Sequence, residues 1–430
     1  MATIPYFWSS EIQTGTLLGS GSYCNVWRVE DIRLVATRGG EVNDADNPDD
    51  MTILERRRQR LAQSFERCRD QKSKRADLAI YGKPTSPPQE VDDPEREPAP
   101  KLAIKRIRHD ELPSFQLRVA QEDFQRELQI LLELAAPCPT SDVSQEKESS
   151  PSSFSPHPNI IELYGIGFED CHSPGWKPAK GYSPFKKNIQ PSFLLLSHIR
   201  ATLAQRLVKW REEKGIGLYE ALSIDVGKRR NQWVERLLVL CKVAHAVEDL
   251  HNHKILYRDI KPANIGYDAM DIPKLFDFGL AKKITDDLRQ RNKNSKEDEC
   301  EEGLFHLTPE TGTLRYMAIE VGKGRPYGWS ADVYSLAILM QEVLSLQLPF
   351  ANIAPRQFRQ VIWNQGHGLV VDPSWPTAIQ KLLPQMWNSN PIDRPTIHHV
   401  VSVLDEMLRG SDEDLFPKSL LIRGRRFSLF

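Results

Sequence analysis

The feature that most restricts the fold of this sequence is a change of hydrophobic pattern near residue 200. Before that position, short apolar or alternating stretches predict strands over about residues 11–36, 101–108, 159–168 and 192–199. Beyond it, apolar residues recur at helical spacing, most clearly over residues 233–251, 331–346 and 376–387. A chain that separates its strands from its helices in this way is expected to fold as α+β with two packing units.

One helix is predicted within the strand-rich half. Apolar residues at helical spacing indicate it over about residues 121–134. We therefore expect a small antiparallel sheet with one helix over residues 11–199, and a larger, mainly helical part over residues 200–408.

Two polar stretches interrupt the first part, at about residues 39–100 and 137–156. Few of their residues can enter a core, so both are predicted to be insertions, the longer one partly helical and partly disordered. Its basic segment, residues 56–75, is expected to be a solvated helix, with binding of acidic partners, RNA or lipid head groups as the alternative. Residues 409–430 are predicted to be a charged C-terminal tail.

Composition limits the partners and the compartment. The formal net charge is −1, so no global field attracts nucleic acid or an anionic membrane, and a local patch would have to hold either one. No nucleic acid partner is expected. The six cysteines show no C-x-x-C pair or regular spacing, which argues against a zinc site or a disulfide framework and favours a reducing compartment. No secretory signal is recognised, and the apolar runs are far shorter than the ~20 residues of a membrane span. We expect a cytoplasmic protein, with the nucleus as a second location.

The first segment with a chemical implication is GSGSYCNV, at residues 19–26. Gly19 and Gly21 flank Ser20 between two predicted strands. Glycines let the backbone approach phosphate oxygens and point its N–H groups at them. A tight turn without a ligand is the alternative, and no helix follows, so the segment is not a dinucleotide-binding fingerprint.

The second segment is a predicted buried strand that carries Lys105. An ammonium group there can bind the α- and β-phosphates of a nucleotide if a carboxylate holds it in place. Glu127, on the predicted helix, is the candidate carboxylate. When this strand is considered without the other motifs, the alternative is that Lys105 is a solvated surface lysine.

The third segment is YRDIKPAN at residues 257–264, followed by DFG at residues 277–279. Asp259 can accept the proton of an incoming hydroxyl. Asn264 and Asp277 supply oxygen ligands of the kind that suit Mg²⁺. A transferred phosphoryl group needs little covalent help, so these residues can supply what catalysis requires by positioning and charge neutralisation.

In their order along the chain, these motifs resemble those of the eukaryotic protein kinase superfamily. The resemblance implies a bilobal kinase fold and transfer of phosphate from ATP, with Mg²⁺, to protein substrates in intracellular signalling. By this resemblance, Lys105 would be the ATP-anchoring lysine and Glu127 its partner. Asp259 would be the catalytic base, and Asn264 and Asp277 would be the two metal ligands.

The resemblance covers about residues 11–408 and implies an adenine pocket. Val26 and Ala103 would cover the adenine ring, Leu196 would be the gatekeeper, and residues 197–199 would form the hinge.

Later motifs imply structural contacts. Residues 311–320, TGTLRYMAIE, resemble the end of an activation segment, and Glu320 would form a buried ion pair with Arg394. Asp332 would hold the backbone of the catalytic loop.

The resemblance also indicates which hydroxyl accepts the phosphate. Lys261 matches the lysine that usually marks serine/threonine specificity, and Thr313 matches a threonine that contacts the catalytic aspartate. The segments at residues 332–337 and 386–395 are most similar to the tyrosine-kinase-like group, most of whose members phosphorylate serine and threonine. Serine and threonine acceptors are therefore expected.

Arg258 directly precedes the predicted base. An arginine at this position is typical of kinases that are regulated by a phosphate on the activation segment. The candidate acceptors in that segment are Thr285, Ser295, Thr308 and Thr311. Thr308 precedes Pro309, so a proline-directed upstream kinase is a candidate partner, and an unmodified surface loop is the alternative.

Two rival functions share parts of this pattern. The main alternative is a pseudokinase scaffold that binds partners through its insertions, although such proteins usually lose the lysine, the base or a metal ligand. A small-molecule kinase should lack Lys261 together with the segment from Thr313 to Glu320. Both features are present, which favours a protein kinase.

Overall fold

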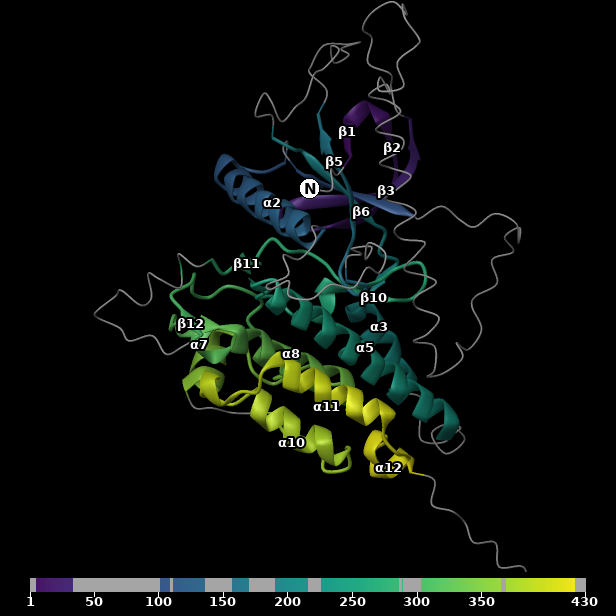
Figure 1. Cartoon of the computed structure of the whole chain (residues 1–430), viewed down its shortest axis with the longest axis vertical. Coiled ribbons are helices and arrows are strands. Elements are labelled where there is room, and N and C mark those ends of the chain that lie inside the picture. Colours follow the sequence, from purple (N-terminus) through teal and green to yellow (C-terminus); the bar gives the residue numbers. More distant parts are fainter. Residues whose placement is uncertain are drawn as a thin grey trace, which may run out of the picture. The chain divides into compact units, whose positions relative to one another are not determined.

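The computed structural model describes residues 5–33, 101–108, 111–135, 157–169, 190–215, 226–285, 288, 303–364 and 369–421. The chain divides into two compact units, Met1–Ile199 and Arg200–Phe430 (Figure 1). Both predicted insertions lie entirely outside the described residues, as do Ser295 and the end of the predicted tail. Among the described residues, no helix has the length and apolar character needed to cross a membrane.

The first unit is built on a six-stranded sheet with the order β1-β5-β6-β4-β3-β2. Its strands are β1 (Tyr6–Trp8), β2 (Ile12–Ser20), β3 (Cys24–Ile32), β4 (Leu102–Ile107), β5 (Leu163–Phe168) and β6 (Phe193–Ser197). The strands β2 to β6 confirm the positions predicted from apolar and alternating stretches. Their apolar side chains form a core around Ile104, Phe193 and Leu195.

The strands β2 to β6 pair antiparallel, as predicted, but β1 adds a parallel pair that makes the sheet mixed and corrects the prediction at this edge. β1 pairs with β5 in parallel, with Tyr6 opposite Ile166 and Trp8 opposite Phe168. Phe7 and Trp8 are buried, so their apolar surface stabilises this added strand. A three-residue strand lies below the length at which alternation can be recognised, and its partner is remote in sequence, which explains why the sequence did not predict it.

The single helix of the first unit is α2 (Ser114–Leu134), which begins seven residues before the predicted range of 121–134. Pro113 stands at its N-cap position with φ −58°, a conformation that leads directly into a helix. The first turn carries Phe115, which is exposed, so no apolar stripe marks it. The remaining turns bury one face, including Phe124, Glu127 and Leu131.

The second unit is mainly helical, as expected. Its helices are α3 (Leu203–Gly215), α5 (Val226–Asn252), α7 (Ile319–Gly322), α8 (Trp329–Ser345), α9 (Pro355–Phe358), α10 (Thr377–Met386), α11 (Ile397–Arg409) and α12 (Asp412–Leu415). α8 is buried along almost its whole length and packs against α5 and α10, while α11 packs against α5 (Figure 1). A helix that is buried on all sides lies at the centre of a helical core.

Short strands and turns connect these helices. The strands are β7 (Ala201–Thr202), β8 (Ile255–Leu256), β9 (Ile265–Tyr267), β10 (Pro273–Leu275), β11 (Lys282–Lys283), β12 (Leu304–Phe305) and β13 (Tyr327–Gly328). β10, β9 and β7 form one antiparallel sheet, and β8 pairs with β11.

The packed part of the second unit extends past the predicted boundary at residue 408. The Trp233 indole N–H on α5 donates to the Leu415 carbonyl at 2.8 Å. Arg230, also on α5, pairs with Asp412 at 2.6 Å and lies over the ring of Phe416. Residues 411–421 are therefore part of the folded unit, and the predicted tail begins inside packed structure.

Candidate active site

In the first unit, Lys105 and Glu127 form an ion pair. Lys105 lies on β4 and Glu127 on α2, and the Nζ to Oε2 distance is 2.6 Å. The Glu127 side chain is 2% exposed and that of Lys105 15% exposed. A buried carboxylate next to an ammonium group stabilises the charged forms of both and fixes the lysine head group. The predicted pair is present.

The residues predicted to cover the adenine ring share one face of the sheet with Lys105. Val26 is directly opposite Lys105 in the β3–β4 pair, and Ala103 is opposite Leu196 in the β4–β6 pair. Opposed residues, and residues two apart on one strand, point to the same side of a sheet. Strand register therefore brings Val26, Ala103, Lys105 and Leu196 onto one surface.

The glycine-bearing segment is the exposed tip of the β2–β3 hairpin. Gly19 is opposite Val26 in the strand register, and the Gly21 N–H donates to the Cys24 carbonyl at 2.8 Å. A Cβ atom at Gly19 would meet no neighbouring atom within 4 Å, and one at Gly21 would meet only the Cys24 carbonyl, at 3.5 Å. The protein's own packing does not require glycine here, so the room above this backbone is available to a ligand.

In the second unit, Asn264 and Asp277 lie at the same end of the β9–β10 hairpin. Asn264 directly precedes β9, Asp277 follows β10, and Ile265 is opposite Leu275. The Phe276 N–H donates to the Asn264 carbonyl at 3.1 Å, which extends the pairing by one step. Asp277 has a positive φ of 66° and is exposed. The predicted metal ligands are thus neighbours.

Three side chains converge on the Asp259 carboxylate. Lys261 Nζ lies 2.6 Å from Oδ2, Asn264 Nδ2 donates to Oδ2 at 2.8 Å, and the Thr313 hydroxyl donates to Oδ1 at 2.7 Å. Lys261 also reaches the Thr313 hydroxyl oxygen, at 2.9 Å. Asp259 is 8% exposed, so these contacts hold the carboxylate in a fixed orientation.

The backbone around Asp259 is held by Asp332, which is fully buried on α8. Its carboxylate accepts the backbone N–H groups of Tyr257 and Arg258 at 2.9 and 2.8 Å. His251 Nε2 lies 2.9 Å from the same carboxylate. Arg258 has a positive φ of 70°, and the two N–H contacts help to maintain this strained conformation. The contact predicted for Asp332 is confirmed.

The segment that carries Thr313 is anchored by a second buried ion pair. Arg394 donates two hydrogen bonds to Glu320, at 2.7 and 2.8 Å, and both side chains are almost completely buried. Arg394 also donates to the carbonyls of Asn388 and Ser330 and lies over the ring of Tyr334. The predicted pair is present, and four of the five guanidinium N–H donors of Arg394 have acceptors in the protein.

The donor set fits a nucleotide with a divalent cation. Both Asn264 side-chain hydrogen bonds use the amide nitrogen, so the amide oxygen is the atom that can ligate a cation, and the exposed residue Asp277 lies at the same end of the β9–β10 hairpin. Two oxygen ligands with solvent beside them suit Mg²⁺, which retains several waters. Lys105 would hold phosphate oxygens, and the hairpin tip would offer its backbone N–H groups.

Some contacts of the site were not anticipated from the sequence. The hydrogen bonds from the Asn264 amide to Asp259 tie a predicted metal ligand to the predicted base. Gly312 has a φ of +108°, and a Cβ atom there would lie 2.4 Å from the Arg258 carbonyl. The glycine directly before Thr313 was the only sequence signal for this close approach.

Comparison with known proteins agrees with this geometry. Residues 223–403 match the family model described as protein kinase domain. The chain is 31% identical to serine/threonine-protein kinase STY17 of Arabidopsis thaliana over 179 residues, which is 41% of this chain and 28% of that protein. It is 33% identical to the probable serine/threonine-protein kinase gdt4 of Dictyostelium discoideum over 186 residues, or 42% of this chain and 10% of that protein.

A further relative is mitogen-activated protein kinase kinase kinase 12 of Rattus norvegicus, 29% identical over 166 residues, or 38% of this chain and 16% of that protein. The chain thus spans less than a third of the length of these curated relatives.

The fold, the site and the family match define the class. Residues 223–403 match the protein kinase domain, and the described residues have the α+β fold expected of the eukaryotic protein kinase superfamily. Within the superfamily, the matched relatives are named as serine/threonine-protein kinases or as mitogen-activated protein kinase kinase kinases. The sequence resemblance to serine/threonine kinases is therefore confirmed.

Proposed function

We propose that this protein transfers the γ-phosphoryl group of ATP, with Mg²⁺, to serine or threonine hydroxyls of protein substrates. The observation that carries the proposal is the environment of Asp259, whose carboxylate is contacted by Lys261, Asn264 and Thr313. A base for an incoming hydroxyl has to be held in a fixed position, and these contacts satisfy that requirement.

Each site residue of the second unit has its own role in the proposed reaction. Asp259 accepts the proton of the substrate hydroxyl. At the same time the hydroxyl oxygen bonds to the γ-phosphorus, and the bond between that phosphorus and ADP breaks. Lys261 holds a positive charge 2.6 Å from that carboxylate, where it can also neutralise the transferring phosphoryl group. Asn264 and Asp277 would hold Mg²⁺, which when bound neutralises charge on the phosphate oxygens.

The residues of the first unit serve the nucleotide. Lys105, fixed by Glu127, binds the α- and β-phosphates, and the hairpin tip at Gly19, Ser20 and Gly21 covers the phosphates. The face formed by Val26, Ala103 and Leu196 offers apolar contact to the adenine ring. The proposal requires that both units act on one nucleotide.

Serine and threonine are the proposed acceptors, because Lys261 and Thr313 both contact the base. The names of the relatives, serine/threonine-protein kinases, support this choice. Protein substrates are accordingly the proposed partners, and the relatives named as kinases of kinase cascades are compatible with a role in intracellular signalling.

An upstream kinase acting on Thr308 is a second proposed partner. Thr308 is exposed, and its carbonyl accepts the Tyr327 hydroxyl at 2.7 Å. Arg258 donates to the same Tyr327 oxygen at 3.1 Å and to the Leu280 carbonyl at 2.6 Å. The Tyr327 hydroxyl thus links the Thr308 carbonyl to the Arg258 guanidinium. A phosphate on Thr308 would add negative charge to a residue that is two hydrogen bonds away from Arg258, and phosphate–arginine pairing orders segments of this kind.

The test compares the wild-type chain with Asp277→Asn in radiolabelled ATP and Mg²⁺, using a mixed protein substrate and phosphoamino-acid analysis. Wild type should label serine and threonine, and the variant should label neither. Asp372→Asn, which changes an exposed aspartate in a loop, is the matched control and should behave as wild type. Equal labelling by wild type and Asp277→Asn would contradict the proposal and favour the scaffold function, and phosphotyrosine as the only product would overturn the choice of acceptor.

We also propose the cytoplasm as the location, with the nucleus as a second one, on the ground that the six cysteines show no disulfide framework in their spacing. Imaging of a fluorescent fusion in intact cells tests this, and a signal confined to secretory compartments would contradict it.

A further inference from the structure

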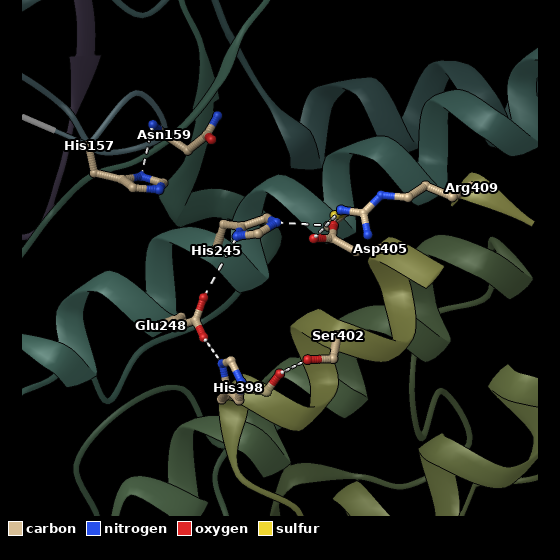
Figure 2. Close-up of polar contacts among 9 residues, drawn as sticks. His157, Asn159, His245, Glu248, His398, Ser402, Asp405 and Arg409 are labelled. Carbon is tan, nitrogen blue, oxygen red and sulfur yellow. Dashed lines mark hydrogen bonds and ion pairs between the residues drawn. The ribbon is translucent and has the colours of Figure 1, made fainter. Parts of the chain in front are cut away.

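Three side chains that the proposed kinase reaction does not use meet between α5 and α11. Cys241 and His245 lie one turn apart on α5, so both face the same neighbour, and Asp405 comes from α11. The Cys241 thiol donates to Asp405 Oδ1 at 3.1 Å, and His245 Nε2 lies 3.1 Å from the same oxygen. Figure 2 shows His245 and Asp405 pointing toward one another from the two helices.

The separations suit one small cation. The Sγ, imidazole nitrogen and carboxylate oxygen all lie within 4.8 Å of one another. Tetrahedral Zn²⁺ with ligand distances of 2.0–2.3 Å holds its ligand atoms about 3–4 Å apart. Small side-chain rotations would therefore bring the three atoms into zinc geometry without moving either helix.

The surroundings of His245 support ligation. Its Nδ1 lies 3.7 Å from Glu248 Oε2, and the other Glu248 oxygen lies 2.7 Å from His398 Nδ1 (Figure 2). Histidines bound to zinc usually donate their second ring N–H to a carboxylate, and Glu248 lies on that side of the His245 ring, where a small rotation would bring it to hydrogen-bond distance. Arg409 lies 3.5 Å from the second Asp405 oxygen, Oδ2, which leaves Oδ1 facing the cluster.

The cluster is reachable from solvent on one side. Cys241 is 5% exposed, whereas the side chains of His245 and Asp405 are 37% and 25% exposed. A cation can therefore enter past the imidazole and keep water as its fourth ligand. In the absence of a cation, burial and the hydrogen bond to Asp405 raise the pKa of the Cys241 thiol, so the thiol carries its proton and acts as a donor.

We propose that Cys241, His245 and Asp405 form a zinc site that joins α5 to α11, with water in the fourth position. On binding, the metal–sulfur bond replaces the S–H bond of Cys241, and the proton passes to solvent. Thiolate and imidazole ligands select Zn²⁺ over Mg²⁺, so the site is chemically distinct from the pair Asn264 and Asp277. The cysteine spacing argued against a zinc site, but spacing along the chain cannot detect one cysteine whose partners include a residue of another helix.

The test uses the full chain, treated with a chelator and then titrated with Co²⁺ in excess Mg²⁺ to occupy oxygen-only sites. We expect stoichiometric binding, a thiolate-to-cobalt charge-transfer band and the visible absorption of tetrahedral cobalt, all displaced by Zn²⁺. Cys241→Ser should lose the charge-transfer band. Cys24→Ser, which changes a half-buried cysteine of the first unit, is the matched control and should retain it.

If circular dichroism shows that Cys241→Ser does not fold, two further variants test the zinc site. His245→Gln leaves the buried thiol in place and should abolish the tetrahedral spectrum. Glu248→Gln should weaken binding by about 10–100-fold, the usual effect of losing an outer carboxylate. Absence of stoichiometric binding by the wild type, or an unchanged spectrum in His245→Gln, would overturn the proposal. The readout is spectroscopic, so the result does not depend on kinase activity.

Discussion

At the scale of single residues, the hydroxyl of Thr313 is expected to position the base. It donates to Asp259 Oδ1 at 2.7 Å and accepts from Lys261 at 2.9 Å. Thr313→Ala removes a hydrogen bond to a charged group, worth about 1.5–3 kcal/mol, so kcat should fall by about 10–100-fold. Steady-state kinetics with a fixed protein substrate would measure this loss.

The matched variant is Thr313→Ser, which keeps the hydroxyl and should recover most of the lost activity. ATP affinity should change little in either variant, because Thr313 contacts the base and its lysine rather than the predicted nucleotide residues. If serine failed to rescue, the methyl group rather than the hydrogen bonds would matter, and the positioning role would be wrong.

A second residue-scale prediction concerns stability. Glu320→Gln leaves the buried guanidinium of Arg394 without its charged partner. Stranding one partner of a buried pair costs about 3–5 kcal/mol, which for a unit of this size lowers Tm on the order of 10 °C. Thermal unfolding followed by circular dichroism would measure the shift.

Glu310→Gln is the control for this experiment. Glu310 pairs with Arg359, and both side chains are more than half exposed. Exposed pairs contribute about 0–1 kcal/mol, so Tm should stay close to that of the wild type. Similar shifts of Tm in Glu320→Gln and Glu310→Gln would contradict the expectation that burial makes the Glu320–Arg394 pair more important for stability than an exposed pair.

At the scale of elements, the end of the activation segment depends on a close backbone approach at Gly312. A Cβ atom there would lie 2.4 Å from the Arg258 carbonyl, and the φ of +108° disfavours any other residue. Gly312→Ala should displace Thr313 from Asp259, and a misplacement of about 1 Å can cost about 10²-fold in rate. Kinetics and thermal unfolding should be measured on the same preparations.

Gly303→Ala separates backbone strain from the close approach. Gly303 also has a positive φ, +90°, but a Cβ atom there would meet nothing within 4 Å. This variant should lose some stability and keep its activity. Equal losses of activity in both variants would assign the effect to strain alone.

The elements also show what the sequence could predict. Long periodic stretches such as those of α5 and α8 were predicted because many residues repeat one pattern. β1 was missed because three residues cannot establish a period, and the start of α2 because its first turn is largely exposed and carries no apolar stripe. Tertiary contacts, rather than local pattern, determine β1.

The same division applies to the candidate site. Ordered motifs predicted the contacts of Lys105 with Glu127 and of Glu320 with Arg394, since each residue stands in a recognisable segment. The cluster of Cys241, His245 and Asp405 was not predicted, because Asp405 is 160 residues from His245 and no motif connects them. Proximity of this kind arises from the packing of α5 on α11 and is visible only in the folded chain.

At the scale of the whole molecule, the proposed function requires the two units to serve one reaction. Lys105 belongs to the first unit and Asp277 to the second. Lys105→Met and Asp277→Asn should each lower kcat/KM by about 10²–10³-fold, because each removes charge stabilisation from the same phosphates. The double variant should lose about as much as the more damaging single variant, since groups that act as a unit are strongly non-additive.

The measurement is a double-mutant cycle on kcat/KM, with thermal unfolding to show that both units stay folded. Lys101→Met, an exposed lysine just before β4, replaces Lys105→Met in a parallel cycle and should leave activity unchanged with or without Asp277→Asn. If the losses of Lys105→Met and Asp277→Asn instead multiplied, the two residues would contribute independently to the reaction, and the expected coupling between them would be contradicted. Sub-additive losses would show that each residue needs the other for its full effect, as groups that act together on one transition state do.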